Sequence, residues 1–537
     1  MIKHICAFFL LIQITSAQKF SFPIDTIDIT GNFGEIRNRH FHQGIDFSTK
    51  GKEYYPVKSV DDGYVYRIKI SKNGFGKCLY IHHPSGLLSV YAHLNAFSNK
   101  IQSLVNQYLI QNRINELDII LKKDSIQVQK NEIVGLSGNT GSSTGPHLHF
   151  EIRNELTEIP ENPFFYFNIN DTTKPAIQKI IFYNLIDTIH PKPLISNKPK
   201  YPDTIIVPSI TGIAFAGYDK IYPNGNPNNI YKVQVFLDNQ KIYQHRLKYI
   251  SFDNTIYVEY FSEKINKQIF QKCFAPHLYP LYFYDTLVNK GRIILKDTNV
   301  HTLHLSFCDE RNNCTDTTIL IKTKQVKTFK NISIKQLMLC LQPIYIKNKY
   351  FEIQIPEKSI FNDIDAQLFY NAEKKSIQFT HSPLPLKFPA TLKISHQLNQ
   401  NEIHKTLLIS AYRYYLPESY DKNFLTFNVK ELSNYYLYTD KLSPKIKPLS
   451  FNKKKKAIII SPQQRNIYFH LSDNTSIKKY SVYINQQFCV SYYYESKKLL
   501  SVEIPQENIS SDEYNIQIIA TDIVDNTTQK SYKLIFK

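Results

Sequence analysis

Short runs of alternating apolar and polar residues occupy most of the first third of the chain. Residues 63–66 (Gly-Tyr-Val-Tyr), 78–81 (Cys-Leu-Tyr-Ile) and 88–91 (Leu-Ser-Val-Tyr) each repeat with the period of two that is typical of a half-buried strand. This pattern predicts a β-rich N-terminal domain.

One segment of that domain has a different period. In the insertion at residues 95–127, the apolar side chains fall at helical spacing, followed by a probable strand at residues 117–121. The helical positions are Ile101, Leu104, Val105, Tyr108 and Leu109. The insertion could form a wall of a substrate cleft or be a packing decoration.

Beyond residue 171, strand patterns continue to the end of the chain with no strong helical period. Residues 230–243 predict a hairpin, and residues 301–307 predict a following strand. A weak repeat aligns residues 309–315 (Asp-Glu-Arg-Asn-Asn-Cys-Thr) with residues 522–528 (Asp-Ile-Val-Asp-Asn-Thr-Thr), each between two apolar strands. Strands that end in Asp/Asn turns favour immunoglobulin-like β-sandwiches.

Three short segments of the first domain carry candidate chemistry. They are residues 42–46 (His-Gln-Gly-Ile-Asp), residues 91–94 (Tyr-Ala-His-Leu) and residues 147–149 (His-Leu-His), the last of which follows a Gly-, Ser- and Thr-rich approach at residues 135–145. A catalytic zinc site uses three nitrogen or carboxylate ligands and keeps a fourth position open. His42, Asp46 and one histidine of the 147–149 segment satisfy that count.

Strand geometry explains the spacing within these segments. Residues two and four apart share one face of a strand, so His42, Gly44 and Asp46 are expected on one face, with Gly44 leaving open space between the two ligands. His147 and His149 share a face of a second strand in the same way. A helix would also bring His42 and Asp46 together, but Gly44 and the flanking aromatic residues disfavour it.

Together, these segments resemble the signature of the M23 family of lysostaphin/LytM-type zinc endopeptidases, which hydrolyse peptidoglycan. The resemblance extends through residues 31–37, 63–65, 80–82, 128–135 and 150–153 and covers essentially all of residues 30–165. Over most of its length the chain also resembles long exported M23 peptidases of Bacteroidetes-type bacteria that append β-sandwiches.

The resemblance implies a role for each site residue. His42, Asp46 and His149 become the ligands of one Zn²⁺ ion, and His93 and His147 become the catalytic pair. One of the pair takes the proton of water and the other stabilises the oxyanion, and the sequence leaves open which does which. All five positions match, so the degeneration that marks non-catalytic members is absent.

Other histidines have simpler interpretations. His40 shares the predicted face of His42 and could compete as a ligand, but the family pattern uses the histidine two residues before Gly44. His82 and His83, at a strand end, are expected to be structural or to line the cleft rim. The remaining histidines lack partners at ligand spacing.

The start of the chain reads as a secretory signal peptide at residues 1–17, with an apolar segment at residues 5–14 and a small-residue cleavage site at residues 15–17. No later stretch reaches the roughly 18 to 20 apolar residues of a membrane span. We therefore expect export to the periplasm or cell envelope, with no transmembrane span in the mature chain.

The fold class expected for the chain is mainly β. An antiparallel β peptidase domain of the LytM/lysostaphin type, with its small helical insertion, precedes immunoglobulin-like β-sandwich modules. After the signal peptide, the expected domains are the peptidase at residues 18–168, a sandwich at residues 169–325, a β-rich module at residues 326–445 and a second sandwich at residues 446–537.

Charge and cysteines add little. The formal net charge of +19 fits an anionic envelope surface better than nucleic acid in an exported chain. The basic run at residues 453–456 is interpreted as a solvated interdomain patch. Cys308 and Cys314 flank a predicted turn, and a disulfide and two unpaired thiols are equally compatible with the sequence.

Three functions compete at this stage. The leading one is a zinc endopeptidase that cuts peptidoglycan stem peptides or cross-bridges. The second is a LytM-type wall-binding or amidase-activating regulator with little hydrolysis, and the third is a structural surface protein dominated by its β-modules. Expected partners are a peptidoglycan peptide and an envelope protein bound through the β-modules.

Overall fold

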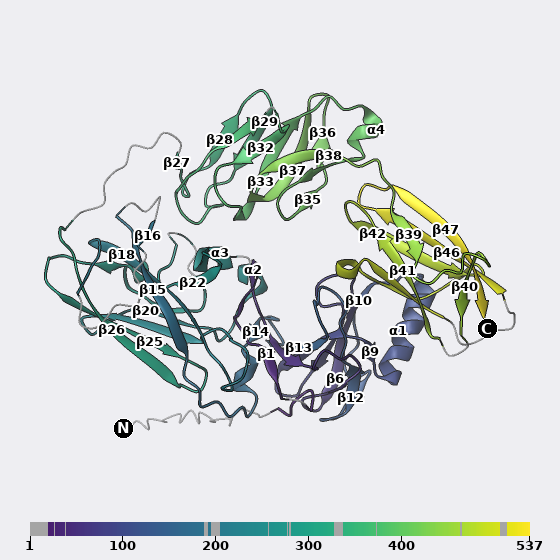
Figure 1. The fold of residues 1–537 in the computed structure, drawn as a ribbon, viewed down its shortest axis with the longest axis horizontal. Helices are drawn as coiled ribbons and strands as arrows, with labels where there is room; N and C mark the ends of the chain where they lie inside the picture. The colour runs from purple at the N-terminus through teal and green to yellow at the C-terminus, as the bar shows by residue number, and fades with distance from the viewer. Residues whose placement is uncertain are drawn as a thin grey trace, which may run out of the picture.

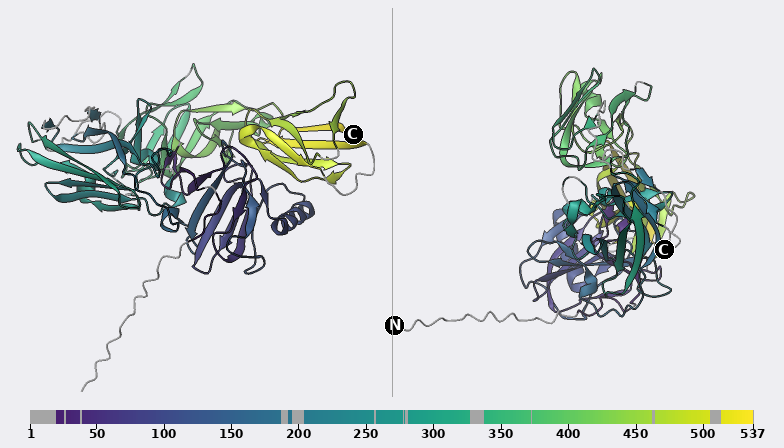
Figure 2. Two further views of the ribbon diagram at one scale, coloured as in Figure 1. Left: turned by 60° about the horizontal axis from the view of Figure 1, so that its bottom comes forward. Right: turned by 90° about the vertical axis from the view of Figure 1, so that its left-hand side faces the viewer.

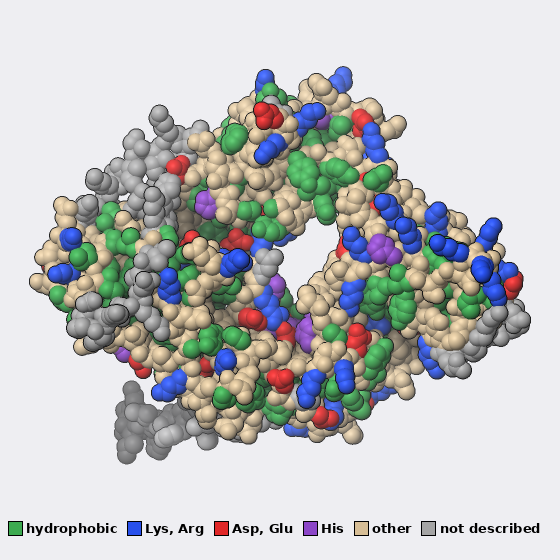
Figure 3. Space-filling view, in the orientation of Figure 1, with side chains coloured by type: hydrophobic (Ala, Val, Ile, Leu, Met, Phe, Trp, Pro, Cys, Tyr) green, Lys and Arg blue, Asp and Glu red, His purple; other side chains and the backbone are tan. Residues whose placement is uncertain are grey.

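The computed structural model describes residues 20–536 except residues 26, 38, 187–191, 195–203, 256, 277, 279–280, 327–336, 372, 462–463 and 505–512. The segment interpreted as a signal peptide lies outside the described residues. The described part of the chain is mainly β, as predicted, and folds into β-rich modules that follow one another around a ring (Figure 1). Figure 3 shows an opening at the centre of this ring.

The first module is built around a large antiparallel sheet with the strand order β1-β4-β13-β8-β7-β6-β10. Its strands are β1 (Ile29–Gly31), β4 (Ile45–Ser48), β13 (His147–Asn154), β8 (Leu87–Leu94), β7 (Lys77–His82), β6 (Gly63–Ile70) and β10 (Leu117–Ile120), with β11 (Gln127–Val128) beside β6 and β14 (Pro160–Glu161) beside β13. The predicted strands at residues 63–66, 78–81 and 88–91 are therefore confirmed.

Smaller elements complete the first module. They are the pair β2 (Ile36–Arg37) and β3 (His40–Phe41), the sheet β5 (Pro56–Lys58), β12 (Ile133–Leu136) and β9 (Ala96–Phe97), and η1 (Pro163–Phe165). The predicted helix is α1 (Asn99–Asn112), which buries Ile101, Val105 and Leu109 in the core of the module. The helical spacing of apolar residues in the insertion therefore corresponds to the buried face of α1.

The second module packs two sheets around a common apolar core. One sheet holds β16 (Lys192–Leu194), β15 (Ala176–Asn184), β18 (Ile210–Tyr218), β22 (Gln268–Lys272), β21 (Ser262–Ile265) and β24 (Ile293–Ile294). The other holds β17 (Ile205–Ile206), β26 (Cys314–Lys322), β25 (His301–Cys308), β19 (Lys232–Leu237), β20 (Gln240–Arg246) and β23 (Tyr284–Leu287). The predicted hairpin is β19–β20. Short helices α2 (Phe252–Thr255) and α3 (Val258–Phe261) and the turn η2 (Val288–Gly291) connect these strands.

The third module is also a sandwich, with its own core. Its sheets contain β28 (Ile344–Lys347), β29 (Phe351–Ile355), β33 (Leu384–Ser395), β37 (Phe424–Leu432) and β36 (Ser419–Tyr420), and β31 (Leu368–Asn371), β32 (Ser376–Phe379), β38 (Tyr435–Thr439), β34 (Thr406–Ile409) and β35 (Tyr414–Tyr415). The pair β27 (Leu337–Met338) and β30 (Ile364–Asp365) and the short helix α4 (Gln400–Ile403) lie beside them.

The fourth module repeats the plan of the second. Its sheets contain β39 (Lys445–Pro448), β41 (Asn466–Ser472), β45 (Leu499–Glu503) and β44 (Ser491–Tyr494), and β40 (Ala457–Ile460), β47 (Thr527–Phe536), β46 (Glu513–Asp522), β42 (Ile477–Ile484) and β43 (Gln487–Phe488), with the turn η3 (Glu495–Lys497). In both modules the last strand pairs in parallel with an early one, β17 with β26 and β40 with β47.

The modules are joined by shared apolar contacts. Phe33 and Phe41 of the first module lie in one cluster with Phe261 and Phe283 of the second and Phe361 of the third. Figure 2 shows the second, third and fourth modules along one side, with the first module against them. The ring is therefore held by buried apolar surface as well as by the chain connections.

The fourth module closes the ring on the first. Val490 and Tyr492 contribute to the core of the first module. Asn115, just beyond α1, accepts a hydrogen bond from the Ser491 N–H at 3.0 Å. Lys77 Nζ lies 3.6 Å from the centroid of the Tyr492 ring, where a cation is attracted by the π-electrons.

Two open points from the sequence are resolved. Cys308 and Cys314 form a disulfide across the β25–β26 turn. The basic run at residues 453–456 is exposed, but it lies in the turn between β39 and β40, so the interpretation as a patch between domains is wrong. Among the described residues, no helix combines the length and the apolar character needed to cross a membrane.

Candidate metal centre

Three neighbouring strands of the first module bring the predicted site residues together. His42, Asp46 and His149 form a buried cluster whose candidate ligand atoms all lie within 4.8 Å of one another. Asp46 is on β4 and His149 is directly opposite it on β13. The antiparallel register therefore unites residues that are about a hundred positions apart in sequence.

The expectation of one continuous strand through His42, Gly44 and Asp46 is wrong. The backbone leaves β3 after Phe41 and enters β4 only at Ile45, so His42 lies in the bend. Gly44 does not leave open space between the two ligands. A Cβ there would stand 2.4 Å from the Phe150 carbonyl oxygen and 2.9 Å from the His149 ring. Gly44 instead lets β13 approach closely enough to deliver His149.

The lone pairs of the three groups converge. His42 Nε2 lies 2.9 Å from His149 Nδ1, and Asp46 Oδ1 lies 3.1 Å from the former and 3.0 Å from the latter. The His42 Nδ1 proton is donated to the Asn32 carbonyl at 2.7 Å, and the His149 Nε2 proton to Glu151 at 3.0 Å. With both rings neutral, His42 Nε2, His149 Nδ1 and Asp46 Oδ1 are three acceptors that face one another, and either a shared proton or a metal cation satisfies them.

Further side chains orient the cluster. Glu151 is fully buried and forms an ion pair with Arg153 at 2.6 Å, so the carboxylate that holds His149 is itself fixed. Arg37 Nη2 contacts the second oxygen of Asp46, Oδ2, at 2.5 Å and thereby keeps Oδ1 turned towards the histidines. Outer contacts of this kind fix the tautomer and orientation of metal ligands.

The charges in the cluster favour a cation. Although burial opposes ionisation of Asp46, His42 and His149 hold the pKa of its carboxyl well below the usual range. Burial likewise opposes a charge on His149, but hydrogen bonds to Asp46 and Glu151 raise the pKa of its imidazole to about 9. Without a metal, His149 therefore holds a proton between Asp46 and Glu151, and a metal ion that binds at Nδ1 takes the place of that proton. Two nitrogens and one carboxylate oxygen are a donor set that fits a divalent metal.

His93 and His147 lie beside this cluster. Their ring centroids are 4.8 Å apart, and His147 Nε2 is 3.6 Å from Asp46 Oδ1. His93 Nδ1 donates to the Thr140 carbonyl at 2.8 Å, and His147 Nδ1 donates to the Gly145 carbonyl at 2.8 Å. Both rings consequently keep Nε2 as a free acceptor. Burial and the neighbouring imidazoles lower the pKa of His93 to about 3, so it is neutral at physiological pH.

The backbone of His93 is in the left-handed region, with φ of 60°. The pairing of β7 with β8 shifts register between Lys77 and Leu79, opposite this end of β8. A left-handed non-glycine residue is costly and is typical of functional sites, where the surrounding structure maintains it. In this conformation the His93 ring is placed so that Nδ1 donates to the Thr140 carbonyl.

The fourth module supports the loop that carries Thr140. Ser496 donates to the Gly141 carbonyl at 3.3 Å, and Lys497 Nζ donates to the Asn139 carbonyl at 2.8 Å. Gly141 in turn packs against Gly76, because a Cβ on Gly141 would lie 2.4 Å from the Gly76 nitrogen. A distant module thus contacts the segment that orients His93.

Other predicted alternatives fall outside the cluster. His40 is exposed at the start of β3 and is not among the clustered ligand atoms. His83 is buried, with hydrogen bonds to the Asp62 carbonyl and the Ser89 hydroxyl, and His82 pairs with Glu155. His83 is therefore structural, as expected. His190 and His277 lie outside the described residues.

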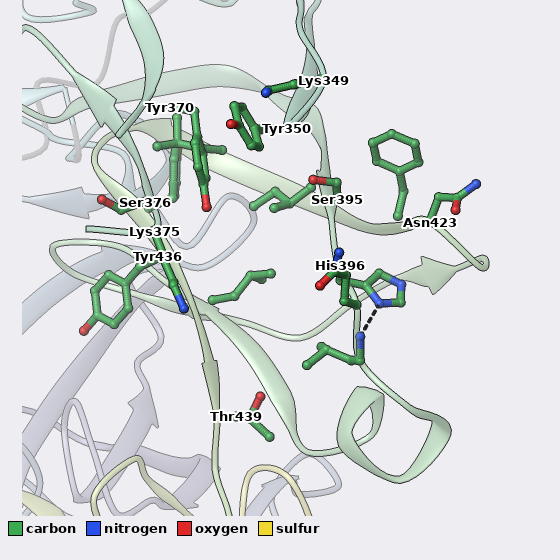
Figure 4. A pocket seen from close by; sticks show the side chains of 17 residues that line it. Lys349, Tyr350, Tyr370, Lys375, Ser376, Ser395, His396, Asn423, Tyr436 and Thr439 are labelled. Atoms are coloured by element: carbon green, nitrogen blue, oxygen red, sulfur yellow. Dashed lines mark hydrogen bonds between the residues drawn. The ribbon is translucent and has the colours of Figure 1, made fainter. Parts of the chain in front are cut away.

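A spacious pocket lies elsewhere, in the third module (Figure 4). It has a volume of about 960 Å³ and is lined in part by the stacked rings of Tyr350 and Tyr370, whose centroids are 4.1 Å apart. His396 faces it and accepts a hydrogen bond from the Leu398 N–H at 3.2 Å. Its lining has no cluster of ligating side chains among the described residues.

Comparison with known proteins agrees with this geometry. Residues 40–111 and 107–163 match the model of peptidase family M23, and residues 335–440 match that of the Zu5-like domain. The first module is thus a domain of peptidase family M23, and the third is similar to Zu5-like domains.

Curated relatives share the same region. The chain is 35% identical over 122 residues to DD-carboxypeptidase/endopeptidase Mpg of Neisseria meningitidis, a match that covers 23% of this chain and 22% of that protein. It is 31% identical over 140 residues to peptidoglycan DD-endopeptidase ShyB of Vibrio cholerae, covering 24% and 26%. The chain thus spans about a quarter of the length of these relatives.

A solved structure is similar at the same place. The catalytic domain of lysostaphin from Staphylococcus simulans is 24% identical, with 25% of this chain and 86% of that chain covered and a TM-score of 0.19.

Glu151 and Arg37 were not predicted as site residues. Glu151 has a sequence signal, because it continues the two-residue period of His147 and His149 along one face of β13. The carbonyls of Asn32, Thr140 and Gly145 have none, since every residue carries a carbonyl.

We expect Glu151→Gln to weaken metal binding at this cluster about 10- to 100-fold, because the outer hydrogen bond to His149 loses its charge. Competition with a chromophoric chelator measures this affinity. Glu155→Gln, just beyond the same strand, is the matched control and should leave affinity unchanged. Equal zinc affinity in Glu151→Gln and the wild type would show that Glu151 only stabilises the fold.

Proposed function

We propose that this protein is a zinc-dependent endopeptidase that hydrolyses peptide bonds in peptidoglycan stem peptides or cross-bridges during cell-wall remodelling. The observation that carries the proposal is the convergence of His42 Nε2, His149 Nδ1 and Asp46 Oδ1, with both ring tautomers fixed by outer acceptors. Relatives named as peptidoglycan endopeptidases support the choice of substrate.

In this proposal His42, Asp46 and His149 hold the zinc ion. A zinc ion bound there supplies Lewis-acid chemistry, because it polarises a carbonyl and lowers the pKa of water towards about 7. Arg37 and Glu151 keep the ligand side chains in place.

His93 and His147 handle protons and charge. Each presents a free Nε2 acceptor, since each Nδ1 proton is held by a backbone carbonyl. Either ring can therefore accept a proton from water and pass it to the leaving amine. A ring that has taken the proton can donate to the developing oxyanion.

The remaining modules position this chemistry. Arg39, three residues before His42, forms ion pairs at 2.9 Å with Glu431 of the third module and at 2.9 Å with Glu259 of the second. We propose that the modules, after export to the periplasm or cell envelope, bind wall or an envelope protein, with no role for nucleic acid.

Metal removal tests the proposal. Purified protein incubated with peptidoglycan should release cleaved muropeptides, lose this activity after chelation and regain it with zinc. Mass spectrometry of the products identifies the peptide bond. Absence of zinc-dependent cleavage, with binding to peptidoglycan retained, would contradict the proposal and favour the regulatory alternative.

A further inference from the structure

Two acidic clusters lie outside the peptidase site, and all of their residues are buried except Asp473, which is half-buried. The first acidic trio consists of Asp171, Asp219 and Asp309, and the second acidic trio consists of Asp440, Asp473 and Asp522. In each trio the candidate ligand oxygens all lie within 4.8 Å of one another. Like charges this close repel strongly when they are removed from water.

The two trios occupy equivalent places in the second and fourth modules. Asp171 and Asp440 precede the first strand of their sandwiches, β15 and β39. Asp219 and Asp473 follow the next long strand of the same sheet, β18 and β41. Asp309 and Asp522 stand at the turn between the last two strands. The sequence repeat aligns only Asp309 with Asp522. The structure shows that the other two residues of each trio are also in equivalent positions.

The duplication extends to the hydrogen bonds. Asn313 Nδ2 donates to Asp309 at 2.6 Å and to the Asp171 carbonyl at 2.9 Å. Asn526 Nδ2 donates to Asp522 at 2.8 Å and to the Asp440 carbonyl at 3.1 Å. The same scaffold thus holds three carboxylates together at both places.

Each trio also contains an oxygen without a partner, at the same position. Asp219 is only 2% exposed, and its Oδ1 has no hydrogen-bond partner within the described residues. In the second trio the equivalent residue is Asp473, whose Oδ2 likewise has no hydrogen-bond partner within the described residues. A buried, unpaired carboxylate oxygen costs about several kcal/mol unless a proton or a metal cation satisfies it.

Nearby basic side chains are engaged elsewhere. Arg311, two residues after Asp309, directs its guanidinium at the carbonyls of Phe164, Phe167 and Ile169. Lys405 Nζ donates to the Val524 carbonyl at 2.8 Å. These contacts cross from the preceding module to the turn that carries Asp309 or Asp522, so each trio lies at a junction between modules.

We propose that each acidic trio binds one calcium ion and thereby fixes the junction between its sandwich and the preceding module. Calcium prefers oxygen ligands at about 2.3 to 2.6 Å, so two oxygens on one ion stand no more than about 5.2 Å apart. The oxygens of each trio, all within 4.8 Å of one another, are close enough to share one ion. Zinc would prefer nitrogen or sulfur ligands, which both trios lack.

The test titrates CaCl₂ into the full-length protein in chelator-treated buffer by isothermal calorimetry, with NaCl of equal ionic strength as the blank. The variants are Asp219→Asn, Asp473→Asn and their combination, and the matched control is Glu373→Gln at an exposed position. We expect two calcium ions per wild-type chain with Kd of about 10⁻⁴ to 10⁻³ M, one in each single variant and none in the double variant.

Thermal unfolding gives an independent readout. Without calcium, Asp219→Asn should raise the Tm, because it removes a buried carboxyl group whose ionisation is opposed by burial and by the neighbouring carboxylates, which raise its pKa to about 8. With about 10 mM calcium the order should reverse, since the wild type gains stability from two ions and Asp219→Asn from only one. Calcium binding that survives in the double variant, or a wild type without calcium-dependent heat or Tm shift, would overturn the proposal. Zinc content is measured in parallel and should be equal in all variants.

Discussion

Replacement of Asp46 by alanine should remove the metal and the hydrolytic activity together. Asp46 Oδ1 stands about 3 Å from the ligand nitrogens of both His42 and His149, and without it two neutral imidazoles remain as the only protein donors. The variant also leaves Arg37, which pairs with Asp46 Oδ2 at 2.5 Å, without that partner. We expect zinc content to fall by about 10-fold or more, because loss of a direct ligand exceeds loss of an outer contact.

Elemental analysis of the purified variant measures this loss, and muropeptide release measures activity. Asp118→Ala is the matched control, because Asp118 makes exposed ion pairs with Arg67 and Lys69 that contribute only about 0 to 1 kcal/mol. A variant that keeps both zinc and turnover would exclude Asp46 as a ligand. Loss of zinc in Asp118→Ala as well would point to general unfolding.

The sequence allowed prediction of those parts of the site that are local. The spacing of His147 and His149 follows from the two-residue period of a strand, which needs no knowledge of neighbouring strands. The strands β6, β7 and β8 are where the sequence predicts them, but β7 and β8 are buried along almost their whole length and not half-buried. The helical period of the insertion likewise predicts α1, because a buried face repeats every turn.

Features that depend on neighbours were missed or wrong. The bend at Gly44 arises because β13 approaches the backbone there, and a single strand's pattern contains no record of that neighbour. The acidic trios show the same limit. Asp309 and Asp522 align in sequence, whereas their partners come from turns at different separations along the chain and become equivalent only when the sheets are superposed. Ring closure by Val490 and Tyr492 is also a long-range contact.

A separation of metal binding from turnover should distinguish His93 from the three ligands. His93→Ala is expected to retain zinc and to lower kcat by about 10²- to 10⁴-fold, which is the usual contribution of a positioned proton-transfer group. The ring of His93 is held by the Thr140 carbonyl and lies beside His147, with ring centroids 4.8 Å apart, so its removal leaves the three-ligand cluster intact. Alanine, like histidine, is an L-residue that is disfavoured in the left-handed region, so the substitution does not relieve the backbone strain at this position.

His40→Ala is the matched control for this variant. His40 is exposed, two residues before His42, and its replacement should keep both zinc and kcat. Zinc content and kcat are measured on the same preparations, so that a folding defect in either variant is visible as a lower Tm. If His93→Ala lost zinc as readily as Asp46→Ala, His93 would be a ligand, and the division between metal-holding and proton-handling residues would have to be redrawn. If His40→Ala lost zinc while His93→Ala retained it, the ligand set would instead shift from His42 towards His40.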